Sequence, residues 1–363
     1  MRPYKYIISG GGTGGHIFPA IAIANEIKAQ DPAATIVFIG GRGKMEMEKV
    51  PQAGYPIHGL WISGFQRKKI MANLLFPLQL LVSFFQALFW WGYYRPDILI
   101  GTGGFASGPM LFVGNMMGSK TFLQEQNSFP GITNKLLAKK AHAIAVAYPE
   151  MNKYFPKTKV YLTGNPVRLS LLDVASCRAD AYPYFDLDPK KKTIAVMGGS
   201  LGAREINRLI MSQLDLFAQL DVQLLWQCGK LYYDTLQKCA AAGVKILPFV
   251  QNMEYFYAVA DILISRAGAT SISELCVVGK PTLLIPSPNV AENHQFHNAN
   301  ALARREAAIV LEEAELSTHF APVFSALVAS EEQQQTLSEN IRKLALPKAT
   351  ETIVHYLKQI HAT

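Results

Sequence analysis

The sequence predicts an α/β fold of two Rossmann-like domains, each a doubly wound parallel sheet, that face a central cleft. The length of 363 residues favours two domains over a single core. Short apolar runs alternate with segments of helix length along the whole chain, which is typical of parallel sheets with crossover helices. A glycine-rich strand-to-helix pattern occurs twice, at residues 6–27 and 193–210, and indicates that both domains start in the same way.

The predicted strands are apolar runs bounded by turn residues. In chain order they span residues 6–8, 36–39, 98–100, 121–123, 143–147, 160–163, 193–197, 222–226, 262–264 and 282–285. We place the first domain at residues 1–167 and the second at 168–346, with irregular structure expected in the charged segment 186–190. A final helical pattern within 347–363 could pack on either domain.

The composition indicates a globular protein. Hydrophobic residues make up 50% of the chain and charged residues 17%, which excludes a disordered or coiled-coil chain. The four cysteines are far apart and form no CxxC pair, so neither a zinc site nor a disulfide framework is expected. The apolar run near the start is too short for a signal peptide, and we expect a cytoplasmic protein.

Positive charge is concentrated in the first half of the chain. Residues 1–168 hold 18 Lys and Arg against 7 Asp and Glu, a net charge of +11, whereas residues 169–363 carry −3. Such an imbalance favours nucleic acid, an anionic membrane or a phosphorylated substrate as partner. The basic cluster at 67–69 adjoins the most apolar stretch of the chain, which favours a membrane over nucleic acid.

Residues 74–91 form an uncharged stretch nearly as long as a membrane span. Three interpretations are open: a full span, a buried core helix, or a helix whose apolar side meets the membrane interface. Polar residues at helical spacing, Gln79, Ser83 and Gln86, disfavour a span, and the basic cluster favours the interface. The residues expected at the membrane are Arg67, Lys68, Lys69, Leu74, Leu75, Leu78, Phe85 and Trp90.

Glycine-rich turns follow three predicted strands, at residues 10–15, 101–109 and 198–202, where backbone amides can approach a phosphate. The first lacks the GxGxxG pattern of dinucleotide-binding proteins, and GxxxxGK[ST] is absent, so an NAD enzyme or a P-loop ATPase is disfavoured. A further polar strand exit ends at Glu274, which is suited to accept hydrogen bonds from ribose hydroxyls. The alternative is a helix-capping glutamate paired with Ser271.

Seven motifs occur in order along the chain: GGGTGGHIFPAIAIA (10–24), GTGGFASGP (101–109), QEQNSFPGITN (124–134), GNPVR (164–168), GGSLGAR (198–204), SRAGATSISE (265–274) and ENHQFHNA (292–299). Together they resemble the MurG family, bacterial GT-B transferases that add N-acetylglucosamine (GlcNAc) to lipid I and so make lipid II for peptidoglycan. The resemblance runs from residue 4 to about residue 360.

The resemblance implies that the second domain holds the donor, UDP-GlcNAc. The first domain would hold lipid I, whose N-acetylmuramic acid (MurNAc) accepts GlcNAc on its 4-hydroxyl with inversion at the sugar carbon. It further implies a peripheral protein on the cytoplasmic face of the bacterial inner membrane, with the anionic membrane surface and other cell-wall synthesis proteins as partners.

The resemblance also assigns site residues by position. The donor contacts fall on Phe249 and Val250 for uracil, Glu274 for ribose, Arg168, Ser200 and Ala269 for the diphosphate, and His294 and Gln295 for the sugar. The acceptor side falls on Thr13, Gly14, Gly15, His16, Gly103, Gly104, Glu125 and Asn127. Phe105 stands where the family more often has tyrosine, and Leu201 where some members have a polar residue.

The chemistry of three candidates can be argued from the residues alone. His16 lies at a loop-to-helix junction, where the helix N-terminus disfavours imidazolium, as a general base requires; a capping histidine is the alternative. Glu125 follows an apolar strand and is either the base or a residue that orients it. The charge of Arg168 suits a diphosphate leaving group. Asp186 and Asp188 match the Asp-x-Asp pattern with which many sugar-nucleotide enzymes hold a divalent ion. They lie in a charged segment before a strand and not at a strand exit, so no metal or other cofactor is expected.

Two other functional classes stay open from the sequence. A sugar-nucleotide epimerase would need the donor residues but not the apolar stretch at 74–91. A non-catalytic membrane-recruiting subunit would need the stretch but not Glu274, His294 and Gln295 together. Both features are present, which favours a transferase.

Overall fold

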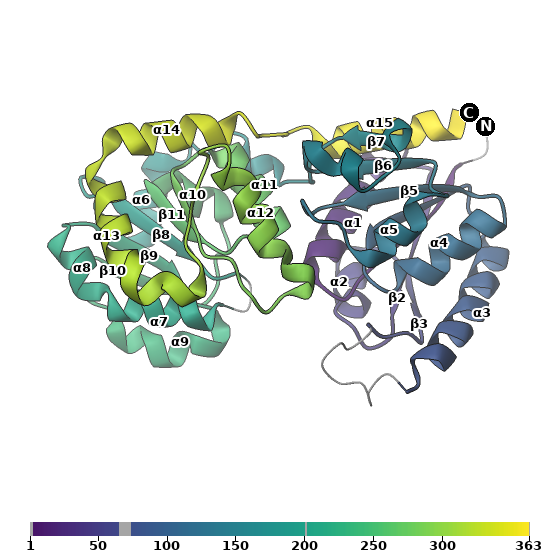
Figure 1. The fold of residues 1–363 in the computed structure, drawn as a ribbon, viewed down its shortest axis with the longest axis horizontal. Coiled ribbons are helices and arrows are strands. Elements are labelled where there is room, and N and C mark those ends of the chain that lie inside the picture. Colours follow the sequence, from purple (N-terminus) through teal and green to yellow (C-terminus); the bar gives the residue numbers. More distant parts are fainter. Residues whose placement is uncertain (1–2, 65–73, 200–201, 363) are drawn as a thin grey trace. The chain divides into compact units, whose positions relative to one another are not determined.

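The computed structural model describes residues 3–64, 74–199 and 202–362. The chain divides into two compact units (Figure 1). The first comprises Met1–Pro166 with Lys348–Thr363, and the second comprises Val167–Pro347. The boundary expected from the sequence, between residues 167 and 168, lies one residue from this division.

The first unit is a seven-stranded parallel sheet in the order β3-β2-β1-β4-β5-β6-β7, with helices on its faces. Its strands are β1 (Lys5–Gly10), β2 (Thr35–Gly41), β3 (Ile57–Leu60), β4 (Ile98–Gly103), β5 (Lys120–Glu125), β6 (Ala143–Val146) and β7 (Val160–Leu162). Its helices are α1 (Gly14–Gln30), α2 (Glu46–Gln52), α3 (Phe76–Tyr94), α4 (Ser107–Met116), α5 (Ile132–Ala138) and α15 (Ala349–Ala362).

The second unit is a six-stranded parallel sheet in the order β10-β9-β8-β11-β12-β13. Its strands are β8 (Thr193–Met197), β9 (Gln223–Gln227), β10 (Val244–Leu247), β11 (Ile262–Ser265), β12 (Thr282–Leu284) and β13 (Ile309–Val310). Its helices are α6 (Arg178–Phe185), α7 (Arg204–Ser212), α8 (Leu214–Gln219), α9 (Lys230–Leu236), α10 (Met253–Val259), α11 (Ala269–Val278), α12 (His294–Ala303), α13 (Leu316–Ala329) and α14 (Glu331–Arg342).

The strand order places a crevice at the carboxyl end of each sheet. In the first unit the order reverses at β1, which lies between β2 and β4. In the second it reverses at β8, between β9 and β11. Helices leave the sheet in opposite directions on either side of such a point, so ligands bind there in doubly wound folds. Both repeated glycine loops therefore follow the strand at a switch point.

The helix α15 packs on the first unit. Ile353 and Leu357 are fully buried in the core that contains β1 and α1. The ring of Tyr356 stacks on Tyr161 with centroids 4.0 Å apart, and α15 contacts α1 and β6 (Figure 1, yellow). The first unit thus takes its core from two distant parts of the chain.

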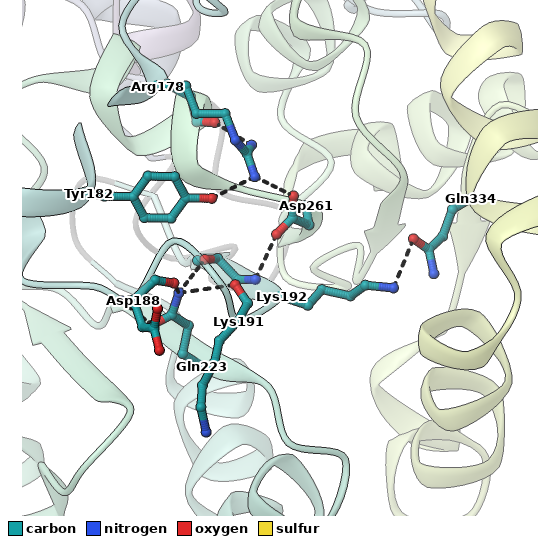
Figure 2. Close-up of polar contacts among 10 residues, drawn as sticks. Arg178, Tyr182, Asp188, Lys191, Lys192, Gln223, Asp261 and Gln334 are labelled. Carbon is teal, nitrogen blue, oxygen red and sulfur yellow. Dashed lines mark hydrogen bonds and ion pairs between the residues drawn. The ribbon is translucent and has the colours of Figure 1, made fainter. Parts of the chain in front are cut away.

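A polar network joins the amino ends of β8 and β11 in the second unit (Figure 2). Asp261 accepts hydrogen bonds from the Thr193 amide at 2.8 Å and from the Arg178 guanidinium at 2.7 Å. Arg178 also donates to the hydroxyl of Tyr182 at 2.6 Å and to the Ala258 carbonyl at 2.8 Å. The network lies at the amino ends of the strands, whereas the crevice is at their carboxyl ends. We therefore infer that the network stabilises the fold of the second unit.

Replacing Asp261 with alanine is expected to destabilise the second unit by about 2 kcal/mol, because it removes the partner of a charged donor and of a backbone amide. Hydrogen exchange of the β8 and β11 amides measures this loss. The control is Lys191→Ala, which breaks an exposed ion pair with Asp221 and should cost less than about 1 kcal/mol. Equal effects of the two substitutions would contradict the assignment.

Candidate functional site

The loop after β1 brings the first group of candidate residues to the carboxyl edge of the sheet. Thr13 precedes α1 as its N-cap residue, and Gly14 and Gly15 are the first residues of the helix. The ring of His16 lies over the loop, with Nδ1 at 3.0 Å from the Gly11 carbonyl oxygen and 3.3 Å from Thr13 Oγ1. A carbonyl oxygen only accepts, so Nδ1 carries the proton and Nε2 is left as an acceptor.

The loop after β4 requires glycine at two positions beside this histidine. Gly103 and Gly104 have φ angles of +96° and +83°. A Cβ atom on Gly103 would lie 3.1 Å from His16 Nε2, and one on Gly104 would overlap the Gly11 carbonyl. The absence of these side chains lets the two loops meet and lets Gly103 lie close to the imidazole.

Glu125 ends β5 and is almost fully buried, with 2% of its surface exposed. Its Oε1 accepts from the backbone amide and the side chain of Asn127, at 3.0 and 3.3 Å. Its Oε2 accepts from Asn134 Nδ2 at 2.9 Å and from the Gly131 amide at 3.2 Å. Burial raises the pKa of Glu125, and these hydrogen bonds oppose that shift. Both oxygens therefore hold the loop that follows the strand.

Asn134 links Glu125 to the histidine side of the crevice, and the sequence reasoning did not select it. A Cβ atom on Gly103 would lie 3.7 Å from Asn134 Nδ2. Its Oδ1 is buried and has no hydrogen-bond partner within the described part of the chain. The signal was present, because Asn134 is the last residue of the motif that begins at Gln124.

In the second unit, Glu274 lies on α11 and is 5% exposed. Its Oε1 lies 3.5 Å from the Arg168 guanidinium, and its Oε2 accepts from the Tyr257 hydroxyl at 3.1 Å. Burial raises the pKa of Glu274, while the charge of Arg168 and the Tyr257 hydrogen bond lower it. Burial and the neighbouring carboxylate raise the pKa of Tyr257 well above its usual range.

The alternative interpretation of Glu274 as a capping residue paired with Ser271 is wrong. The N-cap of α11 is Gly268, which leaves Ser271 inside the helix. The side chain of Glu274 contacts Arg168 and Tyr257 instead. Tyr257, on α10, was missed because nothing in the sequence links it to Glu274.

The other donor candidates lie after the strands β10, β11 and β12 of the second sheet. Phe249, 46% exposed, and Val250, which is buried, follow β10. Ala269 starts α11 after β11, and His294 and Gln295 start α12 after β12. Gln295 Oε1 accepts from the Ser287 amide at 2.9 Å, so Gln295 also shapes the loop after β12. Ser200 lies outside the described residues.

The helix α3 turns its polar stripe toward the protein. Gln79 Oε1 accepts from the Ser63 hydroxyl, and Gln86 Oε1 from the Trp61 amide, both at 2.8 Å. The apolar side of the helix faces outward. Together with the two leucines just before the helix it forms what we term the α3 face: Leu74, Leu75, Leu78, Leu81, Phe85, Phe89 and Tyr93, each exposed. The interpretation as a buried core helix is therefore wrong.

Other predicted membrane residues differ from the α3 face. Trp90 is half-buried, and its ring stacks on His58 with centroids 3.7 Å apart. Arg67, Lys68 and Lys69 lie outside the described residues. Within residues 3–64, 74–199 and 202–362, no helix has the length and hydropathy that crossing a membrane requires.

Comparison with protein families covers both units. Residues 6–146 match the glycosyltransferase family 28 N-terminal domain, and residues 193–353 match the family 28 C-terminal domain. The chain belongs to glycosyltransferase family 28. A family member from Flavobacterium psychrophilum is 53% identical over 98% of this chain and 97% of its own length. One from Christiangramia forsetii is 52% identical over 98% and 97%.

Both relatives are named UDP-N-acetylglucosamine--N-acetylmuramyl-(pentapeptide) pyrophosphoryl-undecaprenol N-acetylglucosamine transferase. The crystal structure of MurG from Acinetobacter baumannii matches this family 28 chain with a TM-score of 0.80 at 26% identity, over 98% of this chain and 100% of that one. The calicheamicin glycosyltransferase CalG4 has the same fold, with a TM-score of 0.73 at 12% identity, over 99% and 100%. The predicted GT-B fold and the resemblance to the MurG family are thus confirmed.

Proposed function

We propose that this family 28 chain transfers GlcNAc from UDP-GlcNAc to the 4-hydroxyl of MurNAc in lipid I, with inversion, to give lipid II for peptidoglycan synthesis. The observation that carries the proposal is the 53% identity, over nearly the full length of both chains, to a relative named for this reaction. The candidate residues of both units lie where ligands bind in doubly wound folds, which supports the same reaction.

The second unit is proposed to hold the donor. The Glu274 carboxylate accepts hydrogen bonds from the ribose hydroxyls, and Phe249 and Val250 receive the uracil. The neighbouring Arg168 pairs with Glu274 but is 55% exposed, so its guanidinium can also reach the diphosphate and stabilise the charge that builds on this leaving group. His294 and Gln295, with Ser200 and Ala269, complete the proposed contacts with GlcNAc and diphosphate.

The first unit is proposed to hold the acceptor and to activate it. His16 Nε2 takes the proton of the 4-hydroxyl as the oxygen attacks the sugar carbon and the bond to UDP breaks. Glu125 is a positioning residue, because its two oxygens hold Asn127, Gly131 and Asn134. Thr13, Gly14, Gly15, Gly103 and Gly104 shape the acceptor crevice around the histidine.

The direct test incubates the purified protein with labelled UDP-GlcNAc and a short-chain lipid I analogue. We expect UDP release and a product one GlcNAc larger than the acceptor, neither of which forms when the acceptor is left out. A sugar-nucleotide epimerase would instead convert UDP-GlcNAc without acceptor, and a recruiting subunit would leave both substrates unchanged. Either result would contradict the proposal.

We also propose that the protein binds peripherally to the anionic cytoplasmic face of the inner membrane through the α3 face. An acceptor whose lipid tail stays in the bilayer requires the crevice to approach the headgroups, and exposed apolar side chains near basic residues achieve this without a span. The outward position of Leu78 and Phe85 supports the proposal.

Replacing both Leu78 and Phe85 with glutamate is expected to lower partitioning onto anionic vesicles by more than about tenfold, since each buried apolar side chain is worth about 1.5–3 kcal/mol. Vesicle co-sedimentation measures the change. Leu231→Glu is the matched control, because Leu231 is 80% exposed on the second unit. Unchanged pelleting of the double variant would refute a role for the α3 face.

The same vesicle assay tests the electrostatic contribution of the basic cluster to membrane binding. The Arg67, Lys68 and Lys69 triple alanine variant is expected to bind less, by about 1 kcal/mol per charge near the surface, and high salt should weaken the wild type. Equal pelleting of both proteins at low and high salt would exclude this part.

A further inference from the structure

A buried carboxylate outside the assigned residues lies under the first glycine loop. Glu46, the first residue of α2, is fully buried. Its Oε2 accepts from the Gly12 amide at 3.0 Å, and its Oε1 accepts from the Gly41 amide at 2.9 Å. A Cβ atom on Gly11 or on Gly40 would collide with the Glu46 side chain. Glycine at these positions makes room for the carboxylate.

The Gly12 N–H that donates to Glu46 belongs to the same peptide group as the carbonyl that contacts His16. The Gly11 carbonyl and the Gly12 N–H are the two ends of one peptide group. The carbonyl end accepts from His16 Nδ1 at 3.0 Å, and the N–H end donates to Glu46 Oε2 at 3.0 Å. A single rigid peptide group therefore joins the carboxylate to the imidazole.

An aromatic ring covers one side of this connection, whereas Gly12 itself is exposed. The Phe105 ring lies against the loop, because Cβ atoms on Gly12 and Gly41 would lie 2.9 and 3.0 Å from its edge. Both hydrogen bonds of this peptide group are part-buried, and connected hydrogen bonds strengthen each other because each polarises the next. The Gly12 N–H donates to a carboxylate, and this hydrogen bond polarises the peptide group. The Gly11 oxygen therefore becomes a better acceptor for the Nδ1–H of His16.

We propose that Glu46 is a positioning residue that acts through the Gly11–Gly12 peptide group to hold the His16 proton on Nδ1, so that Nε2 is the unprotonated nitrogen of the ring. The inference rests on the proposed role of His16 as general base. The negative charge beyond the peptide group also stabilises the imidazolium that forms when Nε2 takes the acceptor proton. In this scheme the acceptor hydroxyl gives its proton to His16 Nε2, and no other protein group takes part in the transfer.

The test uses Glu46→Gln, which nearly preserves shape but turns an amide donor toward the Gly12 or the Gly41 N–H. Histidine labelled with ¹⁵N reports the tautomer of His16 by NMR, with its signals identified by their loss in His16→Gln. We expect the Nδ1–H tautomer in the wild type and a shift toward Nε2–H in Glu46→Gln. The control is Glu48→Gln, which removes the same charge from an exposed position of α2 and should leave the tautomer unchanged.

In the transferase assay, Glu46→Gln should lower kcat about 10- to 100-fold, in line with other residues that orient a catalytic group, while the KM for UDP-GlcNAc changes less than about twofold. A purely structural role would lower activity without moving the tautomer, and that result would overturn the proposal. So would full activity of Glu46→Gln, or an Nε2–H tautomer in the wild type, which needs no variant to fold. Full activity of His16→Ala would instead overturn the base assignment alone.

Discussion

Replacing His16 with alanine is expected to lower kcat by roughly 10²- to 10⁴-fold, the usual contribution of a general base, while UDP affinity changes little. The reason is geometric. His16 belongs to the first unit, its Nδ1 is bound to the Gly11 carbonyl, and its Nε2 lies beside the space left by Gly103. Steady-state kinetics with the lipid I analogue measure kcat, and calorimetry measures UDP binding.

Two further variants make this result specific. His319→Ala removes an exposed histidine of the second unit and should retain activity. In Glu125→Gln, the new amide NH2 group would face N–H donors that now donate to the Glu125 carboxylate. This clash should disturb the loop after β5 and raise the KM for the acceptor. If Glu125→Gln loses kcat to that degree and His16→Ala does not, the two roles are exchanged.

Replacing Glu274 with alanine is expected to weaken UDP binding by about 1.5–3 kcal/mol, or roughly 10- to 150-fold, the range for hydrogen bonds to a charged group. The loss arises because a buried carboxylate already aligned by Tyr257 needs little reorganisation to accept ribose hydroxyls. Glu274→Gln keeps the volume and one acceptor oxygen, so it should lose less affinity. Unchanged UDP affinity by calorimetry, in a variant with wild-type thermal unfolding, would disprove the ribose assignment.

The same residue gives UDP binding a pH dependence. Burial raises the pKa of Glu274, and only the carboxylate form accepts without offering a proton. Affinity should therefore be complete above this raised pKa and fall as the pH drops through it. The fall should begin at a higher pH than for an ordinary glutamate and be absent in Glu274→Gln.

The sequence predicted the central strands well and missed three of the four edge strands; the fourth, β7, was predicted at residues 160–163. The strands β3, β10 and β13 were not predicted, and each lies at an edge of its sheet. Central strands such as β1 are buried on both faces and appear as continuous apolar runs, whereas an edge strand of two to four residues carries little pattern.

The sequence offered candidate site residues where the chemistry is local and missed residues whose contacts cross elements. His16 and Glu274 stand in recognisable motifs after strands, and a strand exit can be located from the chain alone. Glu46 and Tyr257 act on a glycine loop and on a glutamate that are distant in sequence, and only tertiary packing brings them together. On α3 the sequence pattern led us to expect Leu78 and Phe85 on the outer side, and both are exposed, whereas the packing of Trp90 on His58 depends on tertiary structure.

The position of α15 has a consequence for synthesis on the ribosome. The first unit needs Ile353 and Leu357 to complete the core around β1, yet residues 167–347 of the second unit are made in between. At typical translation rates of about 5–20 residues per second, the wait is roughly 10–40 s. During that time the nascent first unit exposes the surface of α1 that α15 later covers, together with the α3 face. Chaperone binding to stalled nascent chains should therefore persist until residues 348–362 have left the exit tunnel.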